Sequence, residues 1–88
     1  MDVGDFKRVV QENGIQKGTF IALKTRNSVC TGYFLEAAYK TSQGGFVNLA
    51  GTRKLGQGRE EEDWYDHSYS IPLARITDVQ VLGQPFDE

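Results

Sequence analysis

The chain has 88 residues, so we expect one domain, and its 39% hydrophobic and 25% charged residues are typical of globular proteins rather than disordered ones. The formal net charge of −2 argues against a strongly basic nucleic-acid binder, whose affinity comes mainly from neutralising phosphates. A weak or base-directed RNA site stays open. With one cysteine, Cys30, no disulfide forms within the chain, and one histidine, His67, leaves too few ligands for a metal site, so we expect neither metal nor cofactor.

No stretch has the apolar length of a signal peptide or of a membrane span. Small secreted domains usually depend on disulfides, which this chain does not form internally. We therefore expect a cytoplasmic protein that makes no contact with a membrane.

The first residues predict a short helix. Four apolar residues share the spacing of one helical face: Val3, Phe6, Val9 and Val10. Asp2 or Asp5 is suited to cap its start, and Gly14 to end it, with Ile15 packing back across the end. A helix of about three turns is not stable alone, so it must lie on the rest of the domain.

After Gly18 the apolar residues alternate as in strands. We expect five strands, over residues 19–25, 29–39, 46–52, 63–73 and 76–82. Gly32, inside the second, predicts a strong bend or a bulge, and Pro72 marks the end or an edge of the fourth. The polar residues 53–63 form a loop or a hairpin tip, and residues 83–88 a loose tail.

Five short, strongly bent antiparallel strands in so few residues close most easily into a small barrel. The predicted fold is therefore mostly β, a short N-terminal helix covering one end of a five-stranded SH3-like barrel.

The order and motifs of these segments resemble the Sm and Sm-like family, which includes bacterial Hfq. The first Sm motif corresponds to FIALKT, the turn RNS, VCTGYFLEAA, a loop and FVNLA, and the second to SIPLARITDVQVL. The resemblance covers about residues 5–82, so we expect residues 1–88 to form a single Sm-like domain. Three departures stand out: Ala37, Ala38 and Tyr39 lie near the place of an acid in the family, the loop that follows is longer by a few residues, and Pro72 and Leu73 lie near the place of an Arg-Gly pair.

The resemblance implies a homo-oligomeric ring of six or seven copies, joined through the fourth and fifth strands, that binds single-stranded RNA near its pore. Carried over by position, Phe46 stacks on a base, Asn48 hydrogen-bonds a base edge and Arg75 contacts the base, while Lys40 adds charge. Each also has a structural interpretation, in which Phe46 is core, Asn48 bonds the backbone of an adjacent loop and Arg75 is solvated.

An alternative is an oligomeric structural or protein-interaction module that has the same barrel and has lost RNA binding. The acidic run of residues 60–63 then docks a basic protein partner, unless it is simply a solvated loop. The aromatic residues Trp64, Tyr65 and Tyr69 beside it are cross-strand packing or part of an interface.

We do not expect an enzyme. Asp66 and His67 are neighbours on a strand and point to opposite faces, and Cys30 on a strand is by default a buried, inert thiol. The glycines at positions 56 and 58 are too few and wrongly placed for a phosphate-binding loop.

Overall fold

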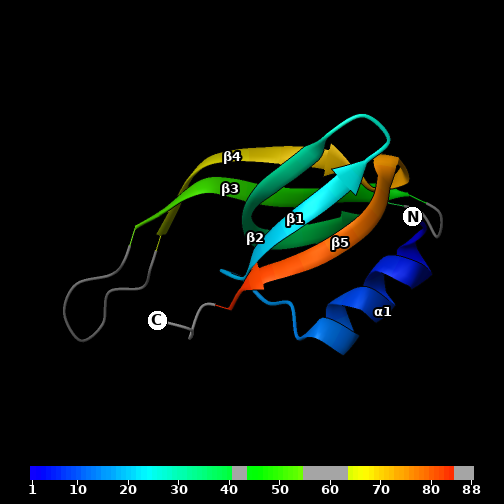
Figure 1. The fold of residues 1–88 in the computed structure, drawn as a ribbon, viewed down its shortest axis with the longest axis horizontal. Coiled ribbons are helices and arrows are strands. Elements are labelled where there is room, and N and C mark those ends of the chain that lie inside the picture. The colour runs from blue at the N-terminus through cyan, green and yellow to red at the C-terminus, as the bar shows by residue number, and fades with distance from the viewer. Residues whose placement is uncertain (41–43, 55–63, 85–88) are drawn as a thin grey trace.

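The computed structural model describes residues 1–40, 44–54 and 64–84, and all six predicted elements occur in it close to their predicted bounds (Figure 1). In chain order these are the helix α1 and the strands β1 to β5, with a short 3₁₀ helix, η1, between the last two strands. Their bounds are α1 Val3–Asn13, β1 Phe20–Thr25, β2 Val29–Tyr39, β3 Gly45–Lys54, β4 Trp64–Pro72, η1 Leu73–Arg75 and β5 Ile76–Gly83.

Both ends of α1 match the predicted caps. The Asp2 side chain accepts a hydrogen bond of 2.7 Å from the backbone N–H of Asp5, which satisfies one of the free donors at the helix start. Gly14 ends the helix in the left-handed conformation, with φ of 61°, and the N–H of Ile15 donates to the Val10 carbonyl at 3.0 Å. The buried side chain of Ile15 then joins the core, as predicted.

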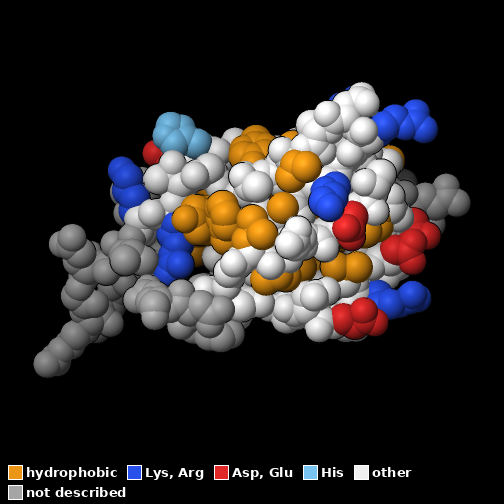
Figure 2. All heavy atoms as spheres, viewed as in Figure 1, with side chains coloured by type: hydrophobic (Ala, Val, Ile, Leu, Met, Phe, Trp, Pro, Cys, Tyr) orange, Lys and Arg blue, Asp and Glu red, His pale blue; other side chains and the backbone are white. Residues whose placement is uncertain are grey.

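The five strands form one antiparallel sheet in the order β4-β3-β2-β1-β5, so β4 and β5 are its two edges. The predicted closed barrel is wrong in this respect, because no ladder joins β4 to β5 in the part of the chain that the structure describes. The two strands leave η1 in diverging directions (Figure 1), so their edges separate instead of pairing. The fold is a strongly bent but open sheet with one helix beside it. Figure 2 shows hydrophobic side chains exposed over the middle of the same face.

One cluster of apolar side chains forms the core, and the sheet contributes most of it. Its buried members are Val3, Phe6, Ile15, Ile21, Leu23, Phe34, Val47, Leu49, Ile71, Leu73 and Ile76. Phe6 brings α1 into this cluster, and the N-terminal amine of Met1 fixes the helix start by donating to the Ile76 carbonyl at 2.7 Å. A three-turn helix gains its stability from this packing.

The interior glycine of β2 is explained by close approach. The register irregularity of β2 lies between Phe34 and Glu36, after the position at which we predicted a bulge. A Cβ on Gly32 would lie 2.9 Å from the carbonyl oxygen of Ala50 and 3.0 Å from the hydroxyl of Tyr69. Glycine therefore allows β3 and a side chain from β4 to press against β2.

Some predictions fall outside the described residues. They concern the polar and acidic segment 55–63, the side chain of Trp64 and the tail from residue 85 onward. Within the described ranges, no helix is both long and apolar enough to cross a bilayer.

Candidate nucleic-acid interface

Lys40 and Phe46 meet at the end of the sheet where β2 stops and β3 starts. The ammonium of Lys40 lies 5.1 Å from the centroid of the Phe46 ring, within the range of a cation–π contact. Phe46 is partly buried and Lys40 is exposed. Across the sheet, Phe46 pairs with Ala38 on one side and with Pro72 on the other. The structure thus brings together an aromatic ring and a cation, two groups that bind single-stranded nucleic acid.

Asn48 lies two residues further along β3 and therefore on the same face as Phe46. Its Nδ2 donates to Oε1 of Glu36 at 3.3 Å, and the hydroxyl of Ser70 donates to its Oδ1 at 2.5 Å. The predicted structural role was a bond to the backbone of a loop, but the observed partners are side chains of the neighbouring strands β2 and β4. We call Glu36, Asn48 and Ser70 the outer-face amide cluster.

The outer-face amide cluster borders a shallow hollow of about 270 Å³ that also includes Ser68 and Tyr69. An asparagine amide has two N–H donors and two acceptor lone pairs, so one donor and one lone pair of Asn48 remain beyond the two bonds described. Asn48 is partly exposed. Its amide therefore keeps hydrogen-bonding capacity for a base edge without first releasing Glu36 or Ser70.

Tyr69 borders the same hollow and reaches across the sheet. Its hydroxyl donates to the backbone carbonyl of Thr31 on β2, next to Gly32. Burial raises the pKa of the Tyr69 phenol, and the nearby thiol of Cys30 raises it further. The phenol thus stays a neutral hydrogen-bond donor over the whole physiological pH range.

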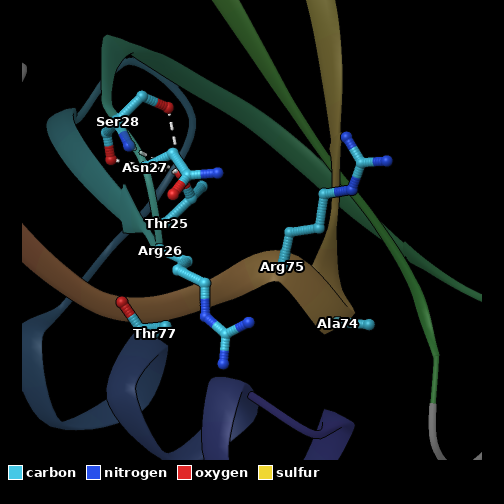
Figure 3. Close-up of a pocket in the computed structure, with 7 residues that line it drawn as sticks. All are labelled: Thr25, Arg26, Asn27, Ser28, Ala74, Arg75 and Thr77. Atoms are coloured by element: carbon cyan, nitrogen blue, oxygen red, sulfur yellow. Dashed lines mark hydrogen bonds between the residues drawn. The ribbon is translucent and has the colours of Figure 1, made fainter.

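Arg75 lies in a different hollow. This hollow, of about 520 Å³, opens between the β1–β2 turn and η1 (Figure 3). Neither Phe46 nor Asn48 lines it, although Pro72, the strand partner of Phe46, precedes η1 directly. Of the four predicted site residues, the structure therefore joins Lys40 to Phe46, sets Asn48 on the same face, and places Arg75 at a separate opening.

Three further residues belong to these two hollows, and the sequence did not point to them. Glu36 and Ser70 bond Asn48 because the register sets both opposite it, and register follows from strand pairing rather than from local sequence. Arg26 lines the Arg75 hollow from a turn that was interpreted only as a chain reversal. The one available signal was a cation in a short polar turn, and most such cations are simply solvated.

Comparison of the chain with protein-family models, with curated proteins and with solved structures found no match. Across the described residues, no three His, Cys, Asp or Glu side chains gather in the way that would hold a metal ion. The functional argument therefore depends on the geometry of this chain, and the Sm-like family stays a prediction.

Proposed function

We propose that this protein is an Sm-like module that assembles into a homo-oligomeric ring and binds single-stranded RNA through the outer face of β3. The observation that carries the proposal is the Lys40 ammonium over the partly exposed ring of Phe46, with the amide of Asn48 two residues further along the same face. These groups are the ones that hold unpaired bases, by stacking, by charge and by hydrogen bonds to the base edge.

Each residue has a distinct part in this proposal. A base stacks on Phe46, and such stacking contributes about 1–3 kcal/mol per base. Lys40 neutralises the phosphate beside that base, and Asn48 uses its remaining N–H or lone pair on the base edge. Because the net charge of the chain is −2, we expect weak binding that depends less steeply on salt than that of a basic protein.

The open edges of the sheet support the ring. β4 and β5 each pair with one neighbour only, so each leaves a row of backbone N–H and C=O groups unpaired within the sheet. Pairing of the strand around Tyr69 with the strand around Val79 of the next copy would satisfy both rows. Such head-to-tail contacts between identical chains produce a closed ring when the rotation allows it, here of six or seven copies.

The test combines oligomeric state with RNA binding. Light scattering after size exclusion should give a ring at micromolar concentration, and a monomer there would contradict the ring. Fluorescence anisotropy at low salt should show binding of labelled oligouridylate or oligoadenylate. Phe46→Leu, which keeps an apolar side chain, and Lys40→Gln should each weaken it, whereas Arg8→Gln, on the exposed side of α1, serves as the charge-matched control.

A second candidate function is favoured by the outer-face amide cluster. Asn48 already bonds Glu36 and Ser70, as expected of a residue that links strands in an oligomeric structural or protein-interaction module. In that case Asn48→Ala disrupts the oligomer, and neither oligouridylate nor oligoadenylate binds the unaltered chain at low salt. Retained assembly with weakened RNA binding instead supports the first proposal.

A further inference from the structure

We propose that the hollow between the β1–β2 turn and η1 is a phosphate-binding site in which Arg26 and Arg75 supply the positive charge. The two arginines are 49 positions apart in sequence and line the same hollow only because of the fold. The other polar groups that line the hollow are hydroxyls and one amide, those of Thr25, Asn27, Ser28 and Thr77. No carboxylate lines the hollow, so no acidic side chain of its described wall competes with a bound anion for the two arginines.

Both guanidinium groups are free to take a ligand. Arg26 and Arg75 are exposed, and among the residues that the structure describes neither has a hydrogen bond or an ion pair. A guanidinium carries five N–H donors in a planar fork that matches the oxygens of a phosphate. The nearest acid in sequence, Asp78, turns its carboxylate to the backbone N–H of Val79 and does not line the hollow.

Hydrogen bonds fix the conformation of the turn that carries Arg26. The N–H of Thr25 donates to the Ser28 carbonyl at 2.8 Å, the N–H of Ser28 donates to the Thr25 hydroxyl at 3.1 Å, and the two hydroxyls lie 2.9 Å apart. On the opposite wall, the hydroxyl of Thr77 donates to the carbonyl of Lys24 at 3.1 Å and so ties β5 to β1. The backbone below both arginines is thus preorganised, and binding needs to order only their side chains.

The directions of the arginines indicate the kind of ligand. Figure 3 shows the guanidinium groups of Arg26 and Arg75 pointing away from each other, Arg26 from the β1–β2 turn and Arg75 from η1. A single phosphate is held by one fork at a time, whereas a chain of phosphodiesters reaches both. A phosphodiester of bound RNA is therefore the ligand expected if the proposed function holds, and this part of the inference rests on that function.

The experiment follows backbone amide resonances of the full-length protein by NMR during titration with inorganic phosphate, with uridine monophosphate and with oligouridylate. We expect shifts at residues 25–28 and 74–77 with all three, and the tightest binding with oligouridylate. Arg26→Gln and Arg75→Gln should each weaken oligouridylate binding by about tenfold, the effect of losing one charge-assisted contact. The affinity of Arg26→Lys should lie between those of Arg26→Gln and the unaltered chain, because lysine keeps the charge but lacks the planar guanidinium fork.

Arg8→Gln is the control for net charge, and the dispersion of each variant's spectrum verifies that it is folded. Phosphate binding that is lost only when Arg26 and Arg75 are both replaced by Gln, without binding of oligouridylate, supports the site and contradicts the proposed function. Oligouridylate binding that depends on Phe46 while residues 25–28 and 74–77 stay unshifted overturns the site and leaves the proposed function standing. The site is also overturned if phosphate in the millimolar range causes no shifts, or if Arg26→Gln binds oligouridylate as tightly as the unaltered chain.

Discussion

The two faces of β3 differ sharply although they are built from alternating residues of one strand. Val47 and Leu49 are 0% exposed and lie in the core, whereas Phe46 and Asn48 are partly exposed on the outer face. The inner pair is held by burial alone. The outer pair is held by a cation over a ring and by two side-chain hydrogen bonds.

This difference separates stability from recognition. Burying an apolar side chain contributes about 1.5–3 kcal/mol, and none of that surface is left for a ligand. A side-chain hydrogen bond at a partly exposed position contributes about 1 kcal/mol net, and its atoms stay within reach of solvent. The outer face of β3 can therefore change its partners at low cost, whereas the inner face cannot. Four predictions test this contrast, from the largest expected effect to the smallest.

Leu49→Ala should have the largest effect, because it leaves a cavity at a fully buried position of the core. We expect a loss of about 2–5 kcal/mol in the free energy of unfolding, measured by urea denaturation. The adjacent outer-face variant, Asn48→Ala, is the matched control. If the two variants lose equal stability, the contrast between the faces is wrong.

Gly32→Ala should destabilise next most, by about 1–3 kcal/mol, because the added methyl group overpacks the contact between β2 and β3. The new Cβ would meet the Ala50 carbonyl oxygen at 2.9 Å, and a backbone atom within a sheet cannot move aside freely. Gly83→Ala on β5 is the control, since a Cβ there meets no atom within 4 Å. Equal stabilities of the two variants in urea denaturation would remove the close approach as the reason for Gly32.

Asn48→Ala should cost about 1 kcal/mol, because it removes both bonds of the outer-face amide cluster at a partly exposed site. Ser70→Ala removes only the bond to Oδ1 and should cost less. Urea denaturation of the two variants and of their combination measures the coupling between them. Exact additivity of the two losses would show that the hydrogen bond between Asn48 and Ser70 contributes nothing.

The smallest effect should come from the two exposed tyrosines at alkaline pH. Burial raises the pKa of Tyr39 and Tyr69 above the ordinary value of 10.0. The folded state therefore keeps the phenol protons longer than the unfolded state, so this stabilisation is complete below pH 10.0 and is lost as the pH rises through the folded pKa values. Because the side chains are 38% and 37% exposed, solvent screening keeps the loss small.

Urea midpoints measured from about pH 9 to about pH 11 test this dependence around the phenol pKa. Tyr69→Phe should be less stable at neutral pH, since it loses the bond to the Thr31 carbonyl, and should lose less on going to alkaline pH. An alkaline loss that is unchanged in Tyr69→Phe would assign the effect to other groups.

Local patterns in the sequence were sufficient for the elements. The cap at Asp2, the end at Gly14 and the strand 29–39 all match the structure, because each depends on contacts between residues close in sequence. The pattern of β4 was a partial error. We predicted that Asp66 and His67 point to opposite faces, but His67 has a positive φ of 56° and its Nε2 lies 4.0 Å from Oδ2 of Asp66.

The candidate site was predictable only in part, because most of its contacts join residues far apart in sequence. The resemblance to Sm-like proteins pointed to Phe46, and the nearby Lys40 does lie over its ring. Neither the partners of Asn48 nor the presence of Arg26 and Arg75 at one hollow was predictable. The residues of each such pair lie 12 to 49 positions apart in sequence. No local rule of propensity or period relates residues at such separations.

The sequence by itself determined a small β-rich domain with one capped helix, since hydrophobic period, caps and turn residues act within a few positions of the chain. Only the tertiary structure decided that the sheet stays open between β4 and β5, that Gly32 makes room for β3 and Tyr69, and that two arginines line one hollow. Sheet register and curvature set these distances, and both arise from strand pairing and core packing summed over the whole domain.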